Sequence, residues 1–175
     1  MQKGFTLLEL LIVIAILAIL TTAVILVMNP AESIKRARDT QRISDLDSLK
    51  TAIVLYVTEG NTNIGAATCT GADSCKSDEC GGAACGEGKA PSQNNGDGWI
   101  PIDFTGMAGG APLSHLPVDP VNTGANRYAY AASSTDFELN ADMESSYFTT
   151  KNKVEENDGG DDNALYEVGT LLTII

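Results

Sequence analysis

The sequence predicts an α+β fold in which a long N-terminal helix packs against a small antiparallel sheet of three to four strands. Three observations predict it. An apolar run extends from Leu7 to Met28, an amphipathic helical pattern covers residues 31–58, and apolar residues alternate over 127–132 and 137–143. With 175 residues, of which the first 28 are committed to a membrane, the chain suffices for one small domain.

The apolar run is long enough to cross a bilayer. Only Glu9, Thr21 and Thr22 interrupt it, and at about 1.5 Å of rise per helical residue it covers roughly 30 Å of hydrocarbon. We therefore expect one membrane-spanning helix over residues 5–28. A conventional secretory signal would end in a small-x-small cleavage site, and this run has none.

The segment Lys3-Gly4-Phe5-Thr6-Leu7-Leu8-Glu9-Leu10 closely resembles the leader of type IV pilins and type II secretion pseudopilins. The resemblance implies a pilin fold, removal of a leader (residues 1–4) after Gly4 by a prepilin peptidase, N-methylation of Phe5, and polymerisation through the hydrophobic helix. It also implies that Glu9 pairs with the amino terminus of a neighbouring subunit. An ionised carboxylate in a bilayer costs about 2–3 kcal/mol or more and needs a partner. The alternative is that Glu9 lies near the headgroups of an ordinary anchor.

The charges that flank the span favour one orientation in the membrane, and other features of the sequence favour the opposite one. Only Lys3 precedes it, whereas Lys35, Arg36, Arg38 and Arg42 follow closely, which by the positive-inside rule favours a cytoplasmic C-terminal part. The leader, the cysteines and the acidic C-terminal part favour the opposite. We therefore predict a single-pass cytoplasmic membrane protein that becomes part of an extracellular or periplasmic filament.

We predict a second helix over residues 29–59. Asn29-Pro30 should interrupt the first one, because proline lacks a backbone donor and disfavours helical angles in the residue before it. In the resembled family such a break lets subunits extend in a filament; a simple boundary between membrane and soluble helices is the alternative. Gly60 should end the helix. The expected apolar stripe consists of Ile34, Ala37, Ile43, Leu46, Leu49, Ile53 and Val57. The opposite face carries Lys35, Arg36, Asp39, Arg42, Asp45 and Lys50, expected as solvated or intersubunit charges.

Residues 60–97 form a Gly-rich segment with few large apolar side chains, so we expect a long surface loop. It contains the four cysteines, Cys69, Cys75, Cys80 and Cys85. An even count outside the cytoplasm predicts two disulfides, with three pairings open. Zinc is the competing reading, but the spacing contains no C-x-x-C pair.

Residues 98–175 should form the sheet. We expect a short strand at 99–102, a rigid turn at 116–120, the hairpin of 127–132 with 137–143, and a last strand at 166–172. The turn Leu116-Pro117-x-Asp119-Pro120 and Tyr128-x-Tyr130 resemble the start of the sheet in major pseudopilins, although Val121-Asn122 departs from the usual aromatic residue.

The net charge of −12 arises entirely after residue 59, where five basic residues face seventeen acidic ones. Such a surface repels phosphates, so we expect no direct nucleic-acid binding. Oxygen donors around Gly159-Gly160 suit calcium, and major pseudopilins bind calcium in a comparable loop; a solvated acidic turn is the alternative. The expected calcium ligands are Asp158, Asp161, Asp162 and Asn163.

No catalytic motif surrounds the single histidine, His115, so we expect no enzymatic activity. The predicted function is a structural subunit of a type IV pilus-like filament. Its partners would be other copies of the chain, the prepilin peptidase, the membrane before assembly, and the inner-membrane assembly machinery. Two alternatives stay open: a type II secretion pseudopilin that drives export, and a monomeric membrane-anchored binding module.

Overall fold

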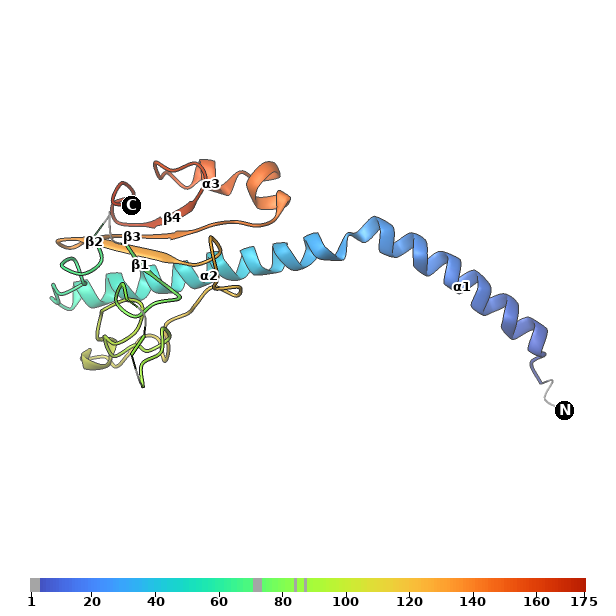
Figure 1. The fold of residues 1–175 in the computed structure, drawn as a ribbon, viewed down its shortest axis with the longest axis horizontal. Coiled ribbons are helices and arrows are strands. Elements are labelled where there is room, and N and C mark those ends of the chain that lie inside the picture. Colours follow the sequence, from blue (N-terminus) through green and yellow to red (C-terminus); the bar gives the residue numbers. More distant parts are fainter. Residues whose placement is uncertain (1–3, 71–73, 84, 87) are drawn as a thin grey trace.

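The computed structural model describes residues 4–70, 74–83, 85–86 and 88–175. Two helices, α1 (Leu7–Met28) and α2 (Pro30–Thr58), form a long bent rod, and the rest of the chain is a head around the far part of α2 (Figure 1). A four-stranded antiparallel sheet has the order β1 (Cys75–Lys76), β2 (Ala129–Ser133), β3 (Asp136–Ala141) and β4 (Tyr166–Gly169). Three short helical segments complete the head: η1 (Phe104–Gly106), η2 (Tyr147–Lys151) and α3 (Val154–Asn157). The predicted α+β fold is confirmed.

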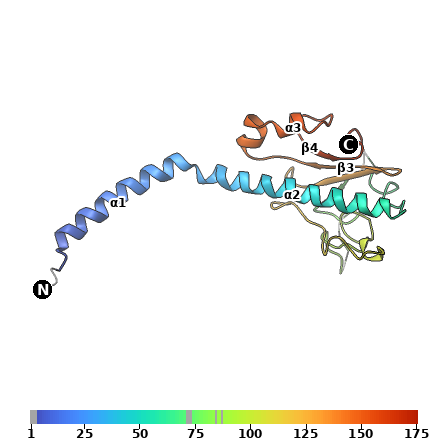
Figure 2. The same ribbon diagram turned by 180° about the vertical axis from the view of Figure 1, so that it is seen from behind.

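The core lies between α2 and the sheet, whereas α1 leaves the head without touching it (Figure 2). Leu46, Leu49 and Ile53 of the predicted apolar stripe are fully buried. Ile34 belongs to the same stripe but is 57% exposed, although the head reaches Glu32 through hydrogen bonds from Ser146 and Tyr147. The helical spacing therefore predicted the buried face of the later part of α2, whereas the buried residues before Leu46 are the charged Asp39 and Arg42.

The hairpin of β2 and β3 runs from the pair Ala129 and Asn140 to the pair Ser133 and Asp136, and it includes the pair Tyr130 and Leu139. Ser134 has a positive φ of 59° in the turn between the strands. Because side chains alternate along a strand, Phe137, Leu139 and Ala141 face the core together, and Glu138 and Asn140 lie on the other face of the sheet.

Three sequence predictions about the head differ from the structure. Residues 99–102 form no strand, although Trp99, Ile100 and Ile102 are fully buried. One reason is that Pro101 has no N–H to donate to a neighbouring strand. The backbone N–H of Trp99 donates to Pro91 O instead. The segment 60–97 is more than a surface loop, since it supplies β1 and the buried side chain of Ile64. The last strand ends at Gly169, earlier than the predicted 172.

All four cysteines are paired, as Cys69–Cys75 and Cys80–Cys85. Both bridges link neighbours in the sequence, a choice among the three pairings that the spacing left open. Cys69 and Cys75 are fully buried and belong to the core. The first bridge thus joins β1 to the hydrophobic interior.

Candidate functional site

Helix α1 begins at a reciprocal pair of side-chain hydrogen bonds between Thr6 and Glu9. The backbone N–H and the hydroxyl of Thr6 donate to Glu9 Oε2 over 2.9 and 2.7 Å, and the Glu9 N–H donates to Thr6 Oγ1 over 3.3 Å. This capping box satisfies donors that a helix start leaves free. Glu9 therefore also starts the helix, which is a local role that the family resemblance did not suggest.

Gly4 and Phe5 precede the helix and are exposed. Phe5 is 79% exposed, and nothing lies within 4 Å of the position that a Cβ of Gly4 would take. The residues on both sides of the peptide bond after Gly4 are therefore exposed. Residues 1–3 of the leader, Lys3 among them, lie outside the described residues.

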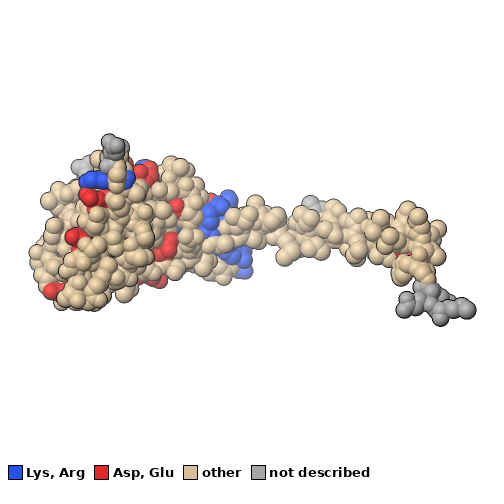
Figure 3. Space-filling model, turned by 90° about the horizontal axis from the view of Figure 1, so that it is seen from below, with Lys and Arg blue, Asp and Glu red and all other residues tan. Residues whose placement is uncertain are grey.

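The apolar side chains of α1 are exposed around the whole helix. Leu7 is 81% exposed, Ile14 58% and Leu20 57%, and residues 7–25 qualify by length and composition as a membrane span. Figure 3 shows that this stalk carries almost no charge, and that Lys and Arg side chains gather where it joins the head. A helix that is apolar on every side needs an apolar environment on every side.

The two helices meet at Asn29, which has left-handed backbone angles (φ 39°, ψ 75°) and serves as the last cap of α1 and the first cap of α2. Its side chain accepts from the Glu32 N–H over 3.4 Å. Pro30 occupies the first turn of α2, where a missing N–H costs nothing. The predicted interruption at Asn29-Pro30 is confirmed, and the bend of the rod lies there (Figure 1).

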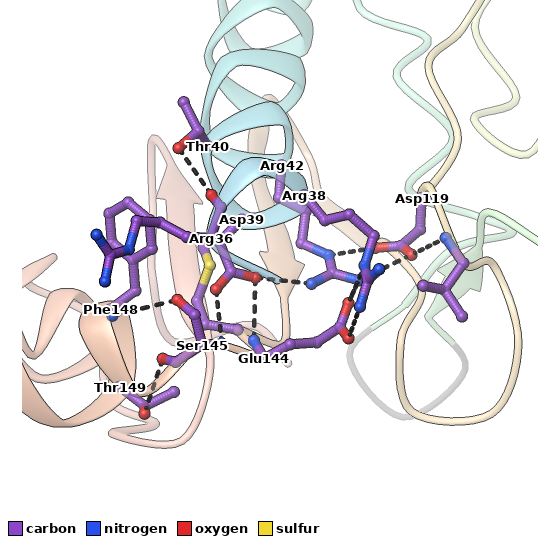
Figure 4. A network of polar contacts seen from close by, with 12 residues as sticks. Arg36, Arg38, Asp39, Thr40, Arg42, Asp119, Glu144, Ser145, Phe148 and Thr149 are labelled. Atoms are coloured by element: carbon purple, nitrogen blue, oxygen red, sulfur yellow. Dashed lines mark hydrogen bonds and ion pairs between the residues drawn. The ribbon is translucent and has the colours of Figure 1, made fainter. Parts of the chain in front are cut away.

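A buried ion network ties the head to α2 (Figure 4). The guanidinium of Arg42 donates to Asp119 Oδ2 over 2.6 Å and to Asp39 Oδ1 over 2.8 Å, and its Nη2 lies 2.6 Å from Glu144 Oε1. Arg42 and Asp39 are fully buried. The prediction that these two residues are solvated or intersubunit charges was therefore wrong; Arg42 joins the helix to two segments far away in the sequence.

Further contacts reinforce the network at its edge. Arg38 donates to both oxygens of Glu144, over 2.9 and 2.5 Å, and the hydrogen bonds from Arg38 and Arg42 lower the pKa of Glu144 to about 2. Asp39 accepts from the backbone N–H groups of Glu144 and Ser145 over 3.0 and 2.8 Å. The segment that follows β3 is thereby held on α2 by charge-assisted bonds.

The predicted calcium ligands do not form a described metal site. Asp158 accepts from the Gly160 and Glu167 N–H groups, and Asp162 accepts from the Ala164 N–H. Asp161 and Asn163 are exposed. Among the residues that the structure describes, no three His, Cys, Asp or Glu side chains form a metal-binding group. Calcium binding by these four residues stays a prediction. The single histidine, His115, is exposed.

Comparison with known proteins gives one match. Residues 1–25 match the family described as the prokaryotic N-terminal methylation motif. No curated protein and no solved structure matches the chain.

Proposed function

Because the methylation motif and the long helix packed on a four-stranded sheet indicate a type IV pilin- or pseudopilin-like protein, we propose that this chain is a structural subunit of a type IV pilus-like filament. The observation that carries the proposal is α1. This helix of 22 residues carries apolar side chains around its whole circumference, those that the structure describes are exposed, and the exposed residues Gly4 and Phe5 precede it. Such a helix needs either lipid or other helices around it.

We expect lipid to surround α1 first, and neighbouring helices to surround it after assembly. Before assembly, α1 spans the cytoplasmic membrane, where its side chains contact lipid. In the filament, copies of α1 replace the lipid, and close packing of side chains drives the exchange, because lipid tails and neighbouring helices are about equally apolar. The acidic head, with its charge confined to residues 60–175, faces solvent.

Glu9 would direct this exchange. It is the only ionisable residue between Leu7 and Met28, and its carboxylate costs about 2–3 kcal/mol or more at membrane depth. Leader removal would place a new amino group on Phe5, and the Phe5 amine of one subunit would then neutralise Glu9 of the next. For this the Glu9 carboxylate must leave or share its bonds to Thr6.

The test is to express the full chain with a prepilin peptidase and a pilus assembly system, and to compare wild type with Glu9→Ala and Glu9→Asp. We expect both variants to insert into the membrane, Glu9→Ala to form no filaments, and Glu9→Asp to retain some assembly. Thr21→Val is a matched control, since it changes a polar residue of the same helix and should assemble normally. Normal filaments from Glu9→Ala would refute the pairing.

Mass spectrometry of the mature terminus separates the remaining alternatives. An N-methylated Phe5 is expected for a pilus subunit and for a type II secretion pseudopilin alike. An unprocessed terminus would favour a monomeric membrane-anchored binding module. Imaging of surface filaments, followed by subunit identification, would separate a pilus from a secretion pseudopilus.

A further inference from the structure

Three polar side chains are buried on the face of the sheet that points away from α2. Glu138 and Asn140 are alternate residues of β3, and Glu167 of β4 pairs with Asn140 in the strand register. Their exposed fractions are 0%, 1% and 1%. We refer to Glu138, Asn140 and Glu167 as the buried acidic group.

Each of its members has a side-chain atom that no described residue satisfies. Glu138 Oε2 accepts from the N–H groups of Ile174 and Ile175, over 2.6 and 3.1 Å, and Glu167 Oε2 accepts from the Asp162 N–H over 3.0 Å. The other oxygen of each carboxylate, and both amide atoms of Asn140, are buried without a hydrogen-bond partner among the described residues. Unpaired buried polar atoms are rare in native proteins, and an ordered water or a bound ion is a usual partner for them.

The charge of the buried acidic group is also uncompensated. None of the ion pairs among the described residues includes Glu138 or Glu167. Two carboxylates that share a dry site require a proton or a cation between them.

The neighbouring segment closes over the group. A Cβ at Gly160 would overlap the Glu167 carboxylate, so only glycine allows the chain to approach so closely. Asp158 fixes this approach, because its carboxylate accepts from the Gly160 N–H over 2.9 Å and from the Glu167 N–H over 2.8 Å. Gly160 and the adjacent backbone thus form a fixed cover over buried oxygen atoms.

We propose that the buried acidic group binds a divalent cation of the size of calcium, through Glu138 Oε1, Glu167 Oε1 and Asn140 Oδ1. Two carboxylates balance a divalent ion, and all three atoms are hard oxygen donors. Calcium accepts irregular geometry and can complete its shell with water and backbone carbonyls, whereas magnesium demands near-octahedral geometry. The ion would hold β3 and β4 together beneath the segment 158–162. This site is independent of the filament proposal.

The ligands differ from those that the sequence predicted. Asp161, Asp162 and Asn163 are exposed at the surface of the adjoining loop. Glu138, Asn140 and Glu167 come instead from two strands separated by the whole of that loop. The two sets can be mutated separately, so one experiment distinguishes them.

The test uses the full chain in detergent, stripped with a chelator and titrated with Ca²⁺ by calorimetry and thermal unfolding. Trp99, the single tryptophan, is fully buried and reports unfolding by fluorescence. Glu138→Gln and Glu167→Gln remove the charge and keep the shape, so these variants should stay folded without calcium. Asp161→Asn is the matched control, with the same loss of one charge in the exposed loop.

We expect calcium to raise the unfolding temperature of wild type and control, and each Gln variant to bind at least about tenfold more weakly. Three results would overturn the proposal. Wild type could show no heat and no stabilisation at millimolar calcium, which would leave a shared proton as the partner. The Gln variants could titrate like wild type. Finally, only the control could lose its response, which would place the ion in the loop.

Discussion

Replacing Arg42 with Met should destabilise the head more than any other single loss of charge in α2. The methionine occupies most of the space of the arginine stem but leaves Asp39, Asp119 and Glu144 without their common cation. Removing one partner from a buried ion network costs about 3–5 kcal/mol, because the remaining charges stay buried and unpaired. That is a large fraction of the roughly 5–15 kcal/mol by which domains are stable.

The assay is thermal unfolding of the full chain, followed by the fluorescence of Trp99. At about 3–5 °C per kcal/mol for a domain of this size, the unfolding temperature should fall by roughly 10–20 °C. The unfolding temperature of Arg42→Lys should lie between those of wild type and Arg42→Met, because lysine keeps the charge but cannot form the two parallel hydrogen bonds to Asp119.

Lys89→Met provides the control for this prediction. Lys89 pairs with Asp97 over 2.5 Å, but their side chains are 48% and 44% exposed, and exposed pairs contribute about 0–1 kcal/mol. If Arg42→Met were no more costly than Lys89→Met, the network would not hold the head on α2, and the reasoning would fail.

Two further predictions concern acid and the disulfides. The folded-state pKa of Glu144, about 2, lies below its ordinary value, so the stabilising contribution of Glu144 is present above about pH 4.5 and is lost as the pH falls toward 2. In Glu144→Gln the unfolding temperature should therefore depend less on pH over that range. The same pH dependence in the variant and in wild type would contradict the assignment. Replacing Cys69–Cys75 with alanines should lower the unfolding temperature more than replacing Cys80–Cys85. The loop-closure effect of each short bridge is about 2 kcal/mol, but only the first is fully buried in the core; equal losses would show that its burial adds nothing.

The sequence predicted the parts of this fold that follow from local periodicity. The spacing of Leu46, Leu49 and Ile53 indicated the buried face of α2, and the alternation around Tyr130 and Leu139 indicated the hairpin. Pro30 marked the start of α2 because proline restricts the backbone, and Gly60 marked its end because glycine frees the backbone.

The polar contacts escaped prediction because their partners are distant in the sequence. Arg42 was interpreted as solvated, since Asp119 lies 77 residues away and nothing local links the two. The pair Asp39 and Arg42, one helical turn apart, was the only available signal. Glu138 lies at an outward position of β3, and only the fold reveals that Gly160 and the C-terminal residues cover that face.

The head contacts α2 from Glu32, which accepts hydrogen bonds from Ser146 and Tyr147, through the ion network around Asp39 to the apolar core that reaches Tyr56. Asp39 and Tyr56 alone are seventeen residues apart, which is roughly 25 Å at about 1.5 Å per residue. An attachment of this length restrains the head on α2, so we expect a change in angle between head and stalk to occur at Asn29, where the two helices are interrupted. In the proposed filament, the packing of the stalks and the spacing of the heads on the surface would then be set separately, with the interruption at Asn29 between them.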